Sequence, residues 1–154
     1  MARRRSIDIT VHSPARPDAV YALLADSSTW PQWSPIDSVS LERDGTPPPE
    51  GVGAIRVNRR GRITGRDEIT ELVPGRRLGY RSLSGLPVVD YRAQVDVEPD
   101  GTGSTIRWRS SFVPKYPGTG LLWQWGIRRL LRQCAEGLAR YAAVERSDPA
   151  RPST

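Results

Sequence analysis

Few residues of this chain have the types and spacing that catalysis by a histidine, a thiol or a metal ion requires. His12 is the only histidine and Cys134 the only cysteine. His12 falls on the polar side of the alternating stretch 6–12, so we expect it to face solvent and not to act as a general base. Cys134 falls on an apolar helical stripe, where a thiol is normally inert packing. The sequence has neither clustered metal ligands nor the glycine spacing of a phosphate loop, so no metal and no cofactor is predicted.

The alternation of apolar and polar residues along the strands selects other polar side chains, those that point inward. It is clearest in 89–98, where every odd position is apolar or tyrosine and every even position is charged or glutamine. The same reasoning places Ile55 and Val57 opposite Arg56. The polar residues on the inward side are Asp67, Tyr80, Ser82, Tyr91 and Ser110. The apolar residues expected to line a cavity with them are Val57, Val95, Trp108, Phe112 and Leu131. Together these ten residues form the predicted ligand site, an apolar wall with a few placed polar groups.

The elements that position these side chains follow from the period of the sequence. Stretches with a period of two are 6–12, 37–43, 52–58, 62–72, 77–84, 88–98 and 104–113. Short helices are predicted after Pro17 and near Trp30. After Pro117 the spacing changes to three and four, which predicts one helix over about 119–144. We therefore expect an α+β fold in which a curved seven-stranded antiparallel sheet, two short helices and a long C-terminal helix enclose a cavity.

The domain boundaries and the compartment are predicted from composition. We expect a basic N-terminal arm at 1–5, one ligand-binding domain at 6–146 and a disordered tail at 147–154. No apolar run is long enough to span a bilayer, and the basic start of the chain lacks the apolar run of a signal peptide. A lone cysteine is compatible with a reducing compartment, so a cytoplasmic location is predicted. The oligomeric state does not follow from the sequence.

The net charge of +6 comes almost entirely from arginine, because the chain has a single lysine. The alternation places most strand arginines, among them Arg92, Arg107 and Arg109, on the solvated face beside acidic residues. Cross-strand charge pairs explain them better than catalysis does. The basic clusters at 3–5, 59–62 and 128–132 lack a recognition helix and an exposed aromatic platform, so a nucleic-acid partner is not expected.

Several segments of the chain together resemble one protein superfamily. They include the strand and turn at 6–21, the segment 26–33, Glu68-Ile69-Thr70-Glu71-Leu72, Pro74-Gly75-Arg76-Arg77-Leu78-Gly79-Tyr80 and 103–108. Over about 5–144 the chain resembles the helix-grip (START-like, SRPBCC) superfamily, which contains START lipid-transfer domains, polyketide cyclases/dehydratases and pollen-allergen relatives. The resemblance implies the helix-grip fold and a hydrophobic small-molecule ligand. It implies no particular reaction, because the scaffold hosts many functions.

Two functions are compatible with these residues. The first is binding or transport of a hydrophobic small molecule, a lipid, polyketide or similar compound, between sheet and C-terminal helix. The alternative is a polyketide cyclase/dehydratase of the aromatase type, which could work with Asp67, a tyrosine or an inward arginine as acid or base, together with the shape of the cavity. A contact between Asp67 and a second inward polar group deep in a cavity would favour the enzyme, and exposure of Asp67 to bulk water would favour the binder. Tyr80, Tyr91, Trp108 and Phe112 are also open to a plainer interpretation as core aromatics.

Overall fold

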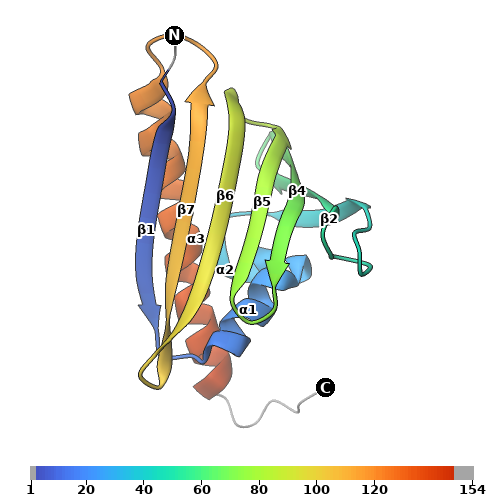
Figure 1. Ribbon diagram of the computed structural model, residues 1–154, viewed down its shortest axis with the longest axis vertical. Coiled ribbons are helices and arrows are strands. Elements are labelled where there is room, and N and C mark those ends of the chain that lie inside the picture. The colour runs from blue at the N-terminus through green and yellow to red at the C-terminus, as the bar shows by residue number, and fades with distance from the viewer. Residues whose placement is uncertain (1–2, 148–154) are drawn as a thin grey trace.

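The computed structural model describes residues 3–147 of the chain (Figure 1). Its elements, in chain order, are β1 (Arg5–Ser13), α1 (Pro17–Ala25), the 3-10 turn η1 (Ser27–Thr29), α2 (Trp30–Trp33), β2 (Ser38–Arg43), β3 (Ile55–Arg60), β4 (Ile63–Val73), β5 (Arg77–Ser84), β6 (Val88–Asp100), β7 (Gly103–Pro114) and α3 (Gly120–Ser147). Apart from Ser147, the predicted tail at 147–154 lies outside the described residues. The division into arm, domain and tail stays a prediction.

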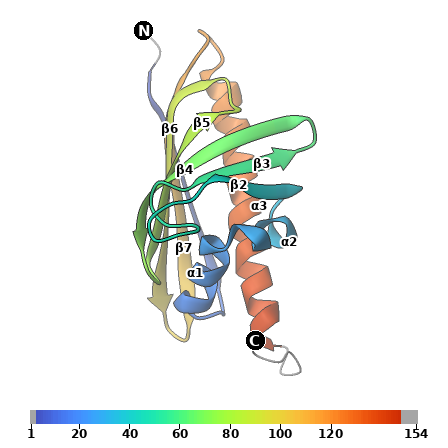
Figure 2. The ribbon, with the colours of Figure 1, turned by 90° about the vertical axis from the view of Figure 1, so that its right-hand side faces the viewer.

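All seven strands form one antiparallel sheet in the order β1-β7-β6-β5-β4-β3-β2. The strands from β2 to β7 are sequential hairpins, and β1 closes the other edge by pairing with β7. The sheet is strongly curved, and its β3–β4 hairpin reaches across α3 (Figure 2). The curved sheet, the two short helices and the long C-terminal helix confirm the fold predicted from the sequence.

Helix α3 lies along the concave face of the sheet because one of its sides is apolar. Ile127, Leu131, Cys134 and Leu138 are each at most 3% exposed and belong to the core. Further along, Gly137 lies directly against α2, where a Cβ atom would come within 1.8 Å of the Trp33 carbonyl oxygen. Only glycine allows this approach, so α2 can pack on the helix and close one end of the space beneath the sheet.

The predicted alternation fails at the start of β6. Val89, an odd position expected to point inward, is 50% exposed. The register with β7 shifts between Val89 and Arg92, and Asp90 adopts a positive φ of 51°. Such a bulge adds one residue to a strand and turns the side chains on either side of it. The prediction for Val89 is therefore wrong, whereas Tyr91 to Val97 alternate as expected.

Candidate functional site

A cavity of about 120 Å³ lies between the concave face of the sheet and α3. Its walls come from the β3–β4 and β5–β6 hairpins, from Trp30 of α2 and from Trp108 on β7. Ile127, Leu130, Leu131 and Cys134 close it on the α3 side. A smaller hollow of about 20 Å³ adjoins it and shares Asn58, Asp67 and Tyr80 with it. Most of the lining is apolar, so the few polar groups define where a ligand could be held.

Asp67 is the carboxyl group on the wall shared by the two hollows, and its pKa is shifted from the ordinary value. Its Oδ2 accepts a hydrogen bond of 2.8 Å from Asn58 Nδ2. Burial raises the pKa of the Asp67 carboxyl to about 7, although the Asn58 hydrogen bond and the nearby Arg56 charge oppose that rise. Near neutral pH, Asp67 is therefore divided between its acid and carboxylate forms. It contacts a second inward polar group inside a cavity, which is the arrangement that favours the enzyme hypothesis.

The position of Arg56 overturns the side assignment predicted for β3. Arg56 is 6% exposed; it faces inward, opposite Asp67 in the register. Its Nε donates to Glu50 Oε1 at 3.0 Å, and its guanidinium carbon lies 5.6 Å from the centre of the Trp30 ring. The prediction that Val57 lines the cavity is wrong. Val57 pairs with Arg66 on the outer face, because a buried ion pair takes the inward place that an apolar residue was expected to fill.

Tyr80, Tyr91 and Trp108 form an aromatic wall opposite α3. Trp108 Nε1 donates to the Tyr80 hydroxyl oxygen at 3.2 Å, and the Tyr80 and Tyr91 rings lie 6.3 Å apart. Burial raises the pKa of both tyrosine hydroxyls, so both keep their protons at neutral pH. The Tyr80 hydroxyl also hydrogen-bonds to the Tyr91 hydroxyl, which opposes the rise of the Tyr91 pKa. Trp108, Tyr80 and Tyr91 therefore form one hydrogen-bonded group near Asp67, and a ligand oxygen would compete with the contact between the two phenols.

The structure distributes the ten predicted site residues over three environments. On the cavity wall are Asp67, Tyr80, Ser82, Tyr91, Trp108 and Leu131. In the core, away from the cavity wall, are Val95, Ser110 and Phe112. Val57 is on the outer face. Ligand contact by any of these residues stays a prediction.

Sequence reasoning missed Asn58 and Arg56 as parts of the site. Arg56 was assigned to the outer face because Ile55 and Val57 are apolar, and apolar residues were expected to point inward; Asn58 was not considered. Their polar character gave no sign of burial. The only available signal was that polar residues occupy every second position at Arg56, Asn58 and Arg60, which places them on one side of β3. Each of the three borders at least one of the two hollows.

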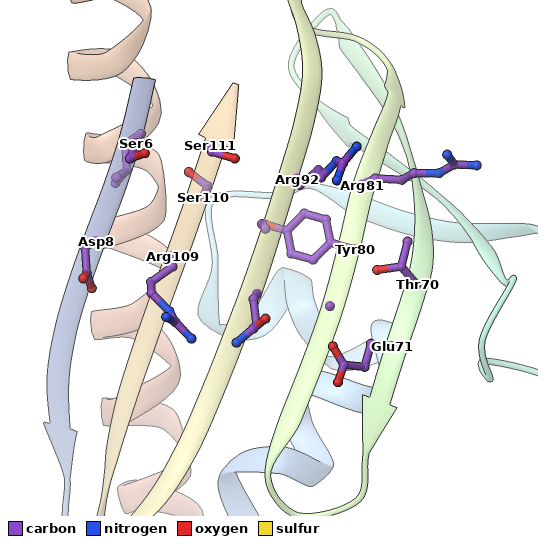
Figure 3. Close-up of a pocket in the computed structure, with 14 residues that line it drawn as sticks. Ser6, Asp8, Thr70, Glu71, Tyr80, Arg81, Arg92, Arg109, Ser110 and Ser111 are labelled. Carbon is purple, nitrogen blue, oxygen red and sulfur yellow. The ribbon is translucent and has the colours of Figure 1, made fainter. Parts of the chain in front are cut away.

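A larger hollow, of about 620 Å³, lies on the opposite, outer face of the sheet (Figure 3). It is open and polar, and its arginines are already paired with acids. Arg81 contacts Glu68 at 2.9 Å, Arg92 contacts Asp90 at 2.9 Å and Arg109 contacts Asp96 at 2.8 Å. The Arg81 and Arg109 pairs match the cross-strand charge pairing predicted for this face, whereas Arg92 pairs with Asp90 of its own strand. Size alone therefore does not make it the better candidate, because its charges are already neutralised by neighbours.

The histidine and cysteine are placed as the sequence predicted. His12 is exposed on β1, where Nδ1 lies 3.0 Å from Asp100 Oδ2. Cys134 is buried, and burial raises the pKa of its thiol to about 12. Within residues 3–147, no three His, Cys, Asp or Glu side chains are grouped in a way that could hold a metal ion. A search of the same residues finds no helix long and apolar enough to cross a bilayer.

Comparison with known proteins places these features in context. An uncharacterized protein of Mycobacterium tuberculosis is 25% identical over 94% of this chain and 89% of its own. A START superfamily protein from Mycobacterium smegmatis has the same fold, with a TM-score of 0.76 and 15% identity over 93% of this chain and 99% of that one. Norcoclaurine synthase from Thalictrum flavum, solved with dopamine and hydroxybenzaldehyde, gives a TM-score of 0.73 and 14% identity over 99% and 91% of the two chains.

The family assignment rests on a match over nearly the whole chain. Residues 4–143 match the family model described as polyketide cyclase/dehydrase and lipid transport. That span runs from the start of β1 through most of α3, so it contains every strand and both walls of the cavity. The chain belongs to the polyketide cyclase/dehydrase and lipid transport family.

Proposed function

We propose that this protein binds a small, largely apolar molecule with one ring and one polar substituent in the cavity between sheet and α3. The observation that carries the proposal is the position of Asp67 on the wall of an otherwise largely apolar space of about 120 Å³. Burying an ionisable group beside such a space costs stability unless something binds to it. Asn58 and Arg56 offset only part of that cost, because the Asp67 pKa is still raised, and a ligand hydroxyl or carbonyl that meets Asp67 would add a further partner.

The size of the cavity limits the ligand. An engineered apolar cavity of about 150 Å³ in another protein binds benzene, so about 120 Å³ suits a single ring. A long acyl chain would require the β3–β4 or β5–β6 hairpin to move away from α3. The aromatic wall formed by Tyr80, Tyr91 and Trp108 also favours a flat ligand.

The family description supports an apolar ligand, because cyclisation of polyketides and transport of lipids both act on apolar molecules. Norcoclaurine synthase, which shares the fold, is solved with two small aromatic compounds, so the scaffold can hold them. The single cysteine and the absence of a spanning helix among residues 3–147 are compatible with the cytoplasm, which we keep as the proposed compartment.

Calorimetric titration with p-cresol and toluene tests the binding proposal. The two compounds have similar shape, and only p-cresol carries a hydroxyl. At pH 8 the Asp67 carboxylate accepts that hydroxyl, so p-cresol should bind about tenfold or more tightly than toluene. In Asp67→Asn this preference should shrink, whereas in the outer-face control Arg107→Gln it should persist. Equal affinity for both compounds in the wild type, or no binding of either, would reject the proposal.

A second function, acid–base catalysis on the bound molecule, is supported by a separate observation. Asp67 has a pKa of about 7, is held by Asn58 and has the protonated Tyr80 hydroxyl on the same wall. A carboxylate with that pKa can take a proton from a carbon next to a carbonyl, while Tyr80 donates to the carbonyl oxygen. Return of the proton to a leaving hydroxyl would complete a dehydration, which is the reaction class of the cyclase/dehydrase half of the family.

Hydrogen–deuterium exchange into acetophenone tests this second function without knowledge of the natural substrate. In deuterated buffer the protein should accelerate exchange at the methyl group next to the carbonyl, and the rate should rise through about pH 7 as Asp67 ionises. Asp67→Asn should lose the acceleration, whereas Arg107→Gln should keep it. Acetophenone that binds without accelerated exchange would leave the protein as a binder alone.

A further inference from the structure

Large apolar side chains are exposed at the end of the molecule where α3 begins, at the top of Figure 1. We call this group the tip patch: Tyr116, Leu121, Leu122 and Trp125. Their exposed fractions are 53%, 70%, 65% and 62%, respectively. The three α3 residues share one side of the helix, since Trp125 follows Leu121 by four positions and Leu122 by three. The core takes its contacts from other residues of α3, so internal packing does not explain this exposure.

Positive charges surround the tip patch. They are Arg3 and Arg5 at the start of β1, Lys115 after β7, and Arg128 and Arg129 one turn beyond Trp125 on α3. Two of them lie over aromatic rings of the patch itself. The Lys115 nitrogen is 5.7 Å from the centre of the Tyr116 ring, and the Arg129 guanidinium carbon is 5.7 Å from that of Trp125.

The five cations around the tip patch differ from the arginines of the outer face in forming no ion pair. On the outer face of the sheet, Arg81, Arg92 and Arg107 each form an ion pair with a carboxylate. Over residues 3–144, no ion pair involves any of the five cations, a property that they share with Arg59, Arg60, Arg62, Arg76 and Arg140. What distinguishes the five is their position around large exposed apolar groups, where no contacting carboxylate neutralises them.

A hollow of about 560 Å³ beside the patch brings the two kinds of side chain together. Arg3, Arg5 and Lys115 line it, along with the apolar groups of Tyr116 and Leu121. No acidic residue borders it. It has room for an anionic headgroup such as a phosphate ester, with apolar surface directly adjacent.

We propose that the tip patch and its five cations dock the protein on an anionic lipid surface. Tryptophan and leucine in the interfacial layer, with basic residues against lipid phosphates, are the usual composition of such a contact. A nucleic acid would pair with the arginines but would leave the two leucines exposed to water. A protein partner would need a surface that matches both the apolar groups and the cations, and nothing in the exposed fractions favours that over a lipid surface.

Docking in this orientation would bring the cavity close to the lipid. Trp125 on the exposed side of α3 and Leu130 on the cavity wall are about 8 Å apart along the helix axis. The docking proposal itself does not depend on what the cavity binds. It therefore stands or fails separately from the proposed function.

Sedimentation with lipid vesicles at low and high salt tests the docking. The full-length protein should bind vesicles of phosphatidylcholine mixed with phosphatidylglycerol, bind phosphatidylcholine alone weakly, and dissociate as salt is raised. Arg128→Gln with Arg129→Gln should weaken binding about 30-fold, because one basic residue at an anionic surface contributes about fivefold. Leu122→Ala with Trp125→Ala should weaken it by about tenfold or more.

The matched control is Arg81→Gln with Arg92→Gln, which removes the same charge from the outer face and should leave vesicle binding nearly unchanged. All substituted residues are exposed, and a thermal melt of each variant checks that it is folded. Three results would overturn the proposal. These are absence of binding to anionic vesicles at low salt, wild-type binding by the Leu122/Trp125 variant, and tighter binding to duplex DNA or to a second copy of the chain than to vesicles.

Discussion

Replacing Asp67 by asparagine should stabilise the folded protein at neutral and alkaline pH, although it removes a side chain from the proposed site. The folded state raises the Asp67 pKa from 3.8 to about 7 because burial disfavours the carboxylate. Asparagine has nearly the same shape and can still accept the hydrogen bond from Asn58. It never ionises, so the cost of burying a charge disappears.

The magnitude follows from the two pKa values. Below the unfolded pKa of 3.8 the carboxyl is protonated in both states, and its ionisation does not affect stability. As pH rises toward 7, the unfolded chain ionises first, and the wild type loses about 1.4 kcal/mol per pH unit. The loss levels off above pH 7 at about 4 kcal/mol, an upper limit because the site can relax or admit water. Asp67→Asn should escape this loss.

Urea denaturation followed by tryptophan fluorescence, repeated from pH 4 to pH 8, measures the effect. The unfolding midpoints of the two proteins should nearly coincide at pH 4. At pH 8 they should differ by up to about 2 M urea, given a denaturant slope near 2 kcal/mol/M.

Asp8→Asn is a control for which the opposite change in stability is expected. Arg107 holds the pKa of the exposed Asp8 below its ordinary value, so this variant should be slightly destabilised at pH 8. If Asp67→Asn is no more stable than the wild type at pH 8, or if the difference does not vary with pH, the account of a buried, protonatable Asp67 is wrong.

Three further predictions concern other charges and the thiol. Arg56→Met should cost about 3–5 kcal/mol in urea denaturation, because it leaves Glu50 without its buried partner; a loss below about 1 kcal/mol would contradict the buried ion pair. Arg107→Gln, which breaks a half-exposed pair with Asp8, should leave the urea midpoint nearly unchanged, and a clear loss of stability would show that this pair is buried in solution. The thiol of Cys134 should react slowly with a disulfide reagent at pH 8 until urea unfolds the protein, because burial raises its pKa to about 12; rapid reaction in the folded state would disprove that burial.

The fold was predictable because each of its elements has a regular period. Strand β7 alternates from Ile106 to Phe112, with every inward residue buried, and α3 places Ile127, Leu131 and Leu138 on one side. Such patterns determine which residues leave water, and burial of apolar surface then determines how sheet and helix pack. The short turns between strands left sequential hairpins as the natural pairing.

The site was less predictable because it depends on local exceptions to these periods. The bulge beside Asp90 turns Val89 outward, and no residue type in that stretch announces it. Arg56 is buried because Glu50, from the loop before β3, and the Trp30 ring of α2 both meet it. The volume of the cavity depends on how the side chains pack, which a period cannot specify. Asp67 was identified because it faces the inner side of the sheet as predicted, although Val57 on the neighbouring strand β3 does not.

Crystallography of the protein soaked with 4-bromophenol tests the central claim most directly, since bromine gives an anomalous signal that locates the ring. We expect the peak between α3 and the aromatic wall of Tyr80, Tyr91 and Trp108, with the phenol oxygen within hydrogen-bond distance of Asp67. In crystals of an Asp67→Asn variant, the peak should weaken or the ring should reorient. A bromine peak confined to the outer-face hollow, or none in the cavity at saturating 4-bromophenol, would contradict the account.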